Sequence, residues 1–111
     1  MAEASKSEKV TNVGTSWTDI VSFSPNEGIR KIQALFEHVG SSNKADFRLQ
    51  AQWNKDGETS SFFTRVTEKG LENGDEPVVV EGTDEVPDTW KIQAKAQSST
   101  VDVLGALATV E

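Results

Sequence analysis

The stretch ADFRLQAQW, residues 45–53, decides the fold. Its apolar residues alternate strictly with polar ones, and this period of two is typical of a β-strand with one buried and one wet face. The residues on its apolar side are Phe47, Leu49, Ala51 and Trp53. The segment WKIQAKAQ, residues 90–97, repeats the pattern with Trp90 and Ile92 on the apolar side. Both segments are therefore predicted to be amphipathic strands that pack on a common core.

Turn residues recur along the rest of the chain at the spacing expected for short strands. They are Gly14, Pro25 with Gly28, Gly40, Gly57, Gly70 with Gly74, Gly82 with Pro87, and Ser98 with Ser99. With the alternating segments, this spacing predicts an all-β protein: a single antiparallel β-sandwich of seven to eight strands over residues 10–111, jelly-roll-like in preference to immunoglobulin-like. The predicted core comprises Phe36, Phe47, Leu49, Trp53, Trp90, Ile92 and Val101.

Two positions do not fit this simple alternation. The final run VDVLGALATV changes its apolar phase at Gly105, and a β-bulge there would place all of its apolar residues on one side. Trp17 precedes a segment of mixed polarity, so its position relative to the core stays open.

Residues 1–9 contain no large apolar residue after Met1, and they predict a polar N-terminal arm outside the sandwich. The apolar central region of a secretory signal is also missing from this start. We expect the arm to lie along a partner, with Val10 and Val13 in a segment that adds a strand to the partner's exposed sheet edge.

Composition argues against several classes of chemistry. The 111 residues include no Cys and one His, His38, which is too few for a His or Cys metal cluster or a nucleophile with its base. His38 is expected to be an ordinary residue at the end of a strand. We therefore expect no enzymatic activity and no cofactor. A net charge of −7 argues against nucleic acid as a partner, and no apolar run is long enough to cross a membrane.

The negative charge is concentrated in residues 68–88. Residues 1–67 hold eight acids and eight bases, and residues 89–111 hold two of each, so the segment between them carries the whole −7. Its candidate partner-docking residues are Glu72, Asp75, Glu76, Asp84 and Glu85. Three interpretations remain open: a solvated acidic loop, a surface that docks on a basic partner, and a calcium site, although the spacing is not that of a helix–loop–helix calcium site.

Three stretches carry a resemblance to a known class of protein. They are TSWTDIVSFSPNEG from Thr15, HVGSSNKADFRLQAQW from His38 and TWKIQAKAQSSTVDV from Thr89. In their order they resemble the small β-sandwich virion proteins of tailed bacteriophages. The resemblance covers residues 15–103 and contains no diagnostic motif.

The resemblance implies a structural part of the virion, in most cases a decoration or cement protein. Such a protein sits on the lattice of the major capsid protein or contacts another virion protein, forms a homo-oligomer in the assembly, and is assembled in the host cytoplasm. The alternative is a glycan- or receptor-binding β-sandwich module of a tail or fibre, because an exposed Trp would stack on a sugar ring.

Overall fold

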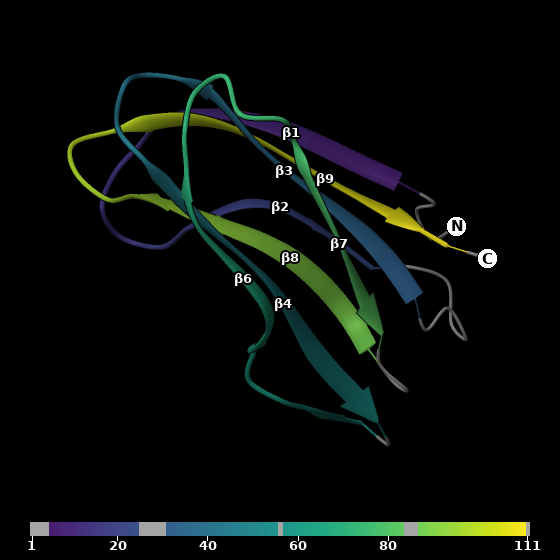
Figure 1. The fold of residues 1–111 in the computed structure, drawn as a ribbon. Helices are drawn as coiled ribbons and strands as arrows, with labels where there is room; N and C mark the ends of the chain where they lie inside the picture. Colours follow the sequence, from purple (N-terminus) through teal and green to yellow (C-terminus); the bar gives the residue numbers. More distant parts are fainter. Residues whose placement is uncertain (1–4, 25–30, 56, 84–86, 111) are drawn as a thin grey trace.

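The computed structural model describes residues 5–24, 31–55, 57–83 and 87–110. In this part of the chain there are nine strands and no helix, arranged as two stacked antiparallel sheets (Figure 1). The strands are β1 (Ser5–Val13), β2 (Thr18–Phe23), β3 (Lys31–Gly40), β4 (Ala45–Lys55), β5 (Glu58–Thr59), β6 (Phe63–Leu71), β7 (Val78–Thr83), β8 (Pro87–Ala96) and β9 (Val101–Thr109). The predicted antiparallel β-sandwich is confirmed. It has one strand more than the seven to eight expected, and β5 is only two residues long.

One layer is a four-stranded sheet with the order β1-β9-β3-β7. The other is a five-stranded sheet with the order β2-β8-β4-β5, in which β6 also pairs with β4. The described part of the chain contains no helix that is long and apolar enough to span a membrane.

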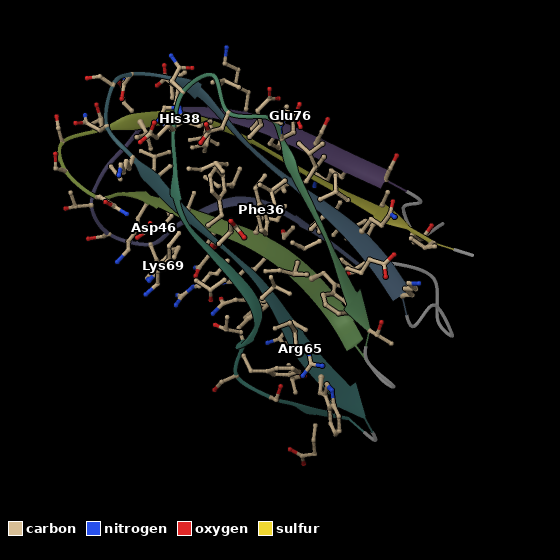
Figure 2. All side chains as sticks on the ribbon, viewed as in Figure 1. Phe36, His38, Asp46, Arg65, Lys69 and Glu76 are labelled. Atoms are coloured by element: carbon tan, nitrogen blue, oxygen red, sulfur yellow. The ribbon has the colours of Figure 1, made fainter. Side chains whose placement is uncertain are left out.

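The core lies between the two sheets, and Figure 2 shows Phe36 in this layer. The rings of Phe36 on β3 and Phe47 on β4 stack with their centroids 5.2 Å apart, which joins the two sheets at their centre. Six of the seven predicted core residues are fully buried, as the alternation required. They are Phe36, Phe47, Leu49, Trp90, Ile92 and Val101.

Trp53 is the exception, and its prediction as a core residue was wrong. The register between β4 and β8 shifts between Gln52 and Trp53, so the alternation of the strand does not continue to its end. Trp53 is 41% exposed as a result.

The predicted bulge at Gly105 was also wrong. β9 pairs with β3 in continuous register through this residue, with Phe36 opposite Gly105 and Leu35 opposite Ala106. The inward positions of β9 are Val101, Val103, Gly105 and Leu107, all of them buried. Gly105 is therefore an inward position without a side chain, and a Cβ there would lie 3.1 Å from the Ile20 side chain.

The N-terminal strand changes the predicted boundary between arm and sandwich. Residues 1–4 lie outside the described part of the chain, but residues 5–9 belong to β1 and pair with β9, from Ser5 opposite Ala108 to Lys9 opposite Leu104. A polar sequence is compatible with this strand because β1 lies at the edge of its sheet.

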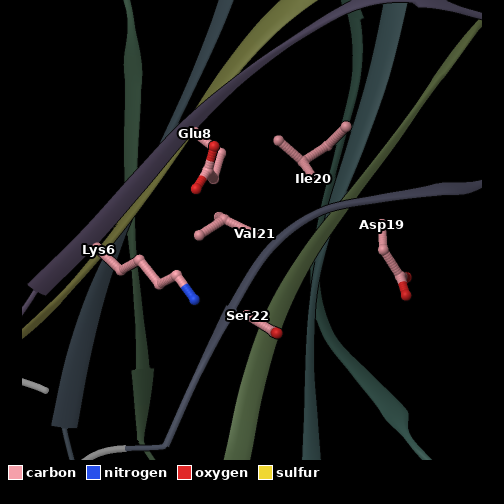
Figure 3. A pocket seen from close by; sticks show the side chains of 6 residues that line it. All are labelled: Lys6, Glu8, Asp19, Ile20, Val21 and Ser22. Atoms are coloured by element: carbon pink, nitrogen blue, oxygen red, sulfur yellow. The ribbon is translucent and has the colours of Figure 1, made fainter.

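The two inward-pointing charges of β1 are Lys6 and Glu8. They line a pocket together with Ile20, Val21 and Ser22 of β2, at the rim where the two sheets come together (Figure 3). Both charged side chains remain exposed, so the first half of β1 closes this edge of the sandwich by backbone pairing, and only Val10 and Val13 at its end contribute to the apolar core.

Candidate binding face on the five-stranded sheet

The outer face of the five-stranded sheet is formed by the polar half of the two alternating strands. Since Phe47, Leu49 and Ile92 point into the core, the residues between them point outward. The outward residues of the two strands are Asp46, Arg48 and Gln50 on β4, and Lys91, Gln93 and Lys95 on β8. The register sets them side by side, with Arg48 opposite Gln93 and Gln50 opposite Lys91. We call this surface the polar face.

Hydrogen bonds fix the side chains of the polar face in place. Arg48 donates from Nε to Oε1 of Gln93 over 2.7 Å, and Gln93 donates from Nε2 to Oδ1 of Asp19 over 2.7 Å. Lys91 Nζ lies 3.2 Å from the same carboxylate oxygen. Gln93 is nearly buried, so its amide holds both Arg48 and Asp19 in a defined orientation.

The same network acts on the charge of Asp19. The hydrogen bond from Gln93, the hydrogen bond and charge of Lys91, and the charge of Arg48 together hold the pKa of Asp19 below its ordinary value, against the opposing effect of partial burial. The network therefore favours the ionised form of Asp19.

Two aromatic rings lie against the cations of this face. The Arg48 guanidinium is 4.2 Å and the Lys95 ammonium 4.9 Å from the centroid of the Trp17 ring. The Lys91 ammonium is 4.0 Å from the centroid of the Phe62 ring. Trp17, whose position the sequence left open, is thus half-buried on the polar face, outside the core.

The outer face of the four-stranded sheet carries a small apolar surface among polar residues such as Gln33 and Glu81. Leu35 on β3 lies between Val79 on β7 and Ala106 on β9 in the register, and Ala108 continues the apolar surface along β9. Val79 is 56% exposed. We call these four residues the apolar strip.

His38 has a structural environment. It is almost fully buried, Nε2 donates to the backbone oxygen of Asn43 over 2.6 Å, and Nδ1 accepts from the backbone N–H of Gly40 over 3.3 Å. These two bonds assign the neutral form with its proton on Nε2. His38 therefore clamps the turn between β3 and β4, consistent with the expected strand-end role.

The docking residues predicted from the sequence differ in how exposed they are in the structure. Val13 is buried and Val10 packs against the core, because both point inward from β1. A contact through these two side chains would require the sandwich to open, so only the backbone edge of β1 remains as the predicted docking element. The strand addition itself stays a prediction.

Three of the five acidic candidates are described and exposed. Glu72 and Asp75 close a turn, with the Glu72 N–H donating to Oδ2 of Asp75 over 2.8 Å, and Lys44 lies 3.5 Å from Glu72. Figure 2 labels Glu76, which follows in the loop before β7. Asp84 and Glu85 lie outside the described residues. Within the described ranges, no group of three or more His, Cys, Asp or Glu side chains is placed to hold a metal ion.

No known protein family and no curated protein matches this sequence. Solved structures do match. One is the CBM22-1 xylan-binding domain of Paenibacillus barcinonensis Xyn10C, with a TM-score of 0.56 and 15% identity over 93% of this chain and 71% of that one. Another is the CBM22-1–GH10 portion of xylanase 10B from Clostridium thermocellum, with a TM-score of 0.54 and 15% identity over 95% of this chain and 24% of that one.

A third match is the protein YomS, derived from the SPBc2 prophage. Its TM-score is 0.50 at 12% identity, and the match covers 99% of this chain and 98% of that one. At these identities the similarities show the fold alone, and they confirm a jelly-roll-like β-sandwich. The structures that share this fold include both a carbohydrate-binding module and a phage-derived protein.

Proposed function

We propose that this protein is a non-enzymatic structural protein of a phage particle, a decoration or cement protein that stabilises the lattice of the major capsid protein. The observation that carries the proposal is the apolar strip. Adjacent apolar side chains on an outer sheet face, with Val79 56% exposed, are typical of a surface that another protein covers. The end-to-end similarity in fold to a prophage-derived protein supports the same role.

The sandwich offers two different surfaces to its surroundings. The apolar strip and the polar face lie on opposite outer sides of the two sheets, so one molecule can contact two neighbouring capsid subunits. Each contact need only be weak, because many copies on one lattice multiply the effect. In this role the protein is assembled onto the particle in the host cytoplasm. In the assembled particle it forms part of the capsid surface as a homo-oligomer.

Co-sedimentation with capsid shells that lack the protein tests this function. The wild type should sediment with the shells, and Val79→Asp should reduce the bound fraction by about tenfold or more, because a charge on the strip must lose its water in the interface. Ser99→Asp is the matched control: it adds the same charge at an exposed turn between β8 and β9 and should bind normally. A wild type that stays in the supernatant contradicts the proposal.

A glycan- or receptor-binding module is the second candidate. Its support is the fold shared with a xylan-binding domain, together with Trp17 and Phe62 on an outer sheet face. Against it, cations already lie over both rings at 4.0–4.9 Å, where a sugar would have to stack. Saturable quenching or enhancement of Trp fluorescence by xylo-oligosaccharides, lost in Trp17→Ala, would favour this candidate over the first.

A further inference from the structure

We propose that Arg48 and Lys95, placed over the ring of Trp17, form a receptor for the carboxylates of an acidic polypeptide segment of the partner protein. This inference names the chemistry of the partner and rests on the structural role proposed above. The carboxylate receptor is defined here as Arg48, Lys95 and Trp17.

The first argument is the orientation of the donors. Gln93 accepts the hydrogen bond of Arg48 Nε, and this leaves the two terminal nitrogens of the guanidinium to bind a carboxylate in two-point fashion. The Lys95 ammonium lies over the same indole ring, 4.9 Å from its centroid. The two cations therefore lie 4.2 Å and 4.9 Å from the centroid of one ring, and Arg48 is oriented before any ligand arrives.

The second argument is that Arg48 and Lys95 make no direct contact with a carboxylate of the described chain, although Asp19 is near enough for the charge of Arg48 to lower its pKa. Three lysines of the described chain have carboxylate partners: Lys31 with Glu81, Lys44 with Glu72, and Lys91 with Asp19. The exposed Lys6, Lys9 and Lys69 form no ion pair among the described residues. Among the described residues, neither Arg48 nor Lys95 forms an ion pair, although the chain carries 18 acidic side chains.

The register partner of Lys95 is Asp46, but the two side chains form no ion pair, and one carboxylate oxygen of Asp46 is engaged elsewhere. Oδ1 of Asp46 accepts hydrogen bonds from the Gly70 N–H at 3.0 Å and from Gln97 Nε2 at 2.9 Å. Two cations over one ring repel each other at distances where salt screens little. A carboxylate from outside would relieve this repulsion and supply the missing partner.

The third argument favours a polypeptide over a sugar. A neutral glycan binds by stacking on an open aromatic face, whereas the face of Trp17 has the guanidinium and the ammonium over it. What the receptor presents is positive charge and N–H donors. Exposed Asp and Glu side chains of a protein segment match these features directly.

A titration with a synthetic peptide of ten glutamates tests the receptor, with a peptide of ten glutamines as the neutral control. The full-length protein should bind the glutamate peptide with an affinity that falls as salt rises, and Trp fluorescence should change on binding. Replacing both cations, in Arg48→Gln/Lys95→Gln, should weaken binding about tenfold or more, since each lost charge removes a charge-assisted hydrogen bond.

Lys6→Gln/Lys9→Gln is the matched control, because it removes two exposed positive charges on β1, away from the receptor. It should bind the glutamate peptide like the wild type, and equal weakening by both pairs would overturn the proposal in favour of a net-charge effect. Trp17→Phe should retain binding and lose most of the fluorescence change. Circular dichroism and melting curves establish that each variant is folded.

Two further outcomes overturn the proposal. One is the absence of salt-dependent binding of the glutamate peptide. The other is tight binding of polygalacturonate, lost in Arg48→Gln/Lys95→Gln, with no binding of the peptide, which would assign the receptor to an acidic glycan.

Shell co-sedimentation distinguishes failure of this inference from failure of the proposed function. If the wild type sediments with shells and Arg48→Gln/Lys95→Gln sediments equally well, the receptor proposal fails and the structural role stands. If the wild type does not sediment but binds the glutamate peptide through these two residues, the structural role fails and the carboxylate receptor stands.

Discussion

Replacing Gly82 by Ala tests how tightly the core is packed. Gly82 lies on β7 opposite Ile32, and its side of the strand faces the core. A Cβ at this position would lie 2.5 Å from Cζ3 and 2.8 Å from Cη2 of Trp90, and 3.0 Å from Cδ2 of Leu49. Ordinary contacts between carbon atoms begin near 3.5 Å, so the ring must move by roughly 1 Å.

The Trp90 ring has little room for this movement, because both Trp90 and Leu49 are fully buried. Overpacking of a closed core costs about 1–3 kcal/mol, and we expect Gly82→Ala to lie near the upper end. For a domain of this size, that loss corresponds to a fall in Tm of roughly 10 °C. Urea denaturation and calorimetry both measure it.

A second substitution tests the cause. Trp90→Phe shortens the ring that the new methyl group meets, and it removes an indole N–H that has no hydrogen-bond partner among the described residues. In this background the cost of Gly82→Ala should fall below about 1 kcal/mol, a coupling expected only for groups in contact. Gly105→Ala is the control with looser contacts of 3.1–3.3 Å and should cost less. A Gly82→Ala variant as stable as the wild type, or an equal loss in both backgrounds, refutes the argument.

Three further outcomes follow from the structure. The lowered pKa of Asp19 means that its ionised form stabilises the fold above its ordinary pKa of about 4. This stabilisation is lost as the pH falls through the lowered pKa, so Asp19→Asn should flatten the decline of Tm below about pH 4 and leave it unchanged near about pH 6. Deleting residues 1–9 should lower Tm and promote aggregation, because β9 loses its edge partner; unchanged melting would mean that β1 contributes nothing. Leu49→Ala should cost about 2–5 kcal/mol in urea denaturation with the strand spectrum retained, and a cost below 1 kcal/mol would contradict its burial.

The fold was predictable because its two central strands are strictly amphipathic. Over residues 45–52 of β4 and 89–96 of β8, polar outward residues alternate with apolar inward ones, so the sequence alone names most of the core. The edge strand β1 was not predictable in this way. Residues 5–9 of this strand are held by backbone pairing with β9, and that contribution is independent of side-chain polarity.

The errors at Trp53 and Gly105 have a common origin. Periodicity assumes that each inward position carries a side chain and that the register continues to the end of the strand. At Trp53 the register shifts, and at Gly105 an inward position is empty because Ile20 and Ile92 from the opposite sheet approach it closely. Both departures arise from contacts between strands far apart in sequence, which a single alternating segment does not encode.

The sequence of the polar face contains more basic than acidic residues, although the whole chain is acidic. On the outward positions of β4 and β8, three cations alternate with amides, and Asp46 is the single acid among them, in a chain whose net charge is −7. A solvated face of such an acidic protein would be expected to contain more acids than bases. The opposite bias lies on the two most regular strands, and the proposed carboxylate receptor rests in part on it. What strand periodicity alone does not show is that Trp17, from outside both strands, lies beneath two of these cations.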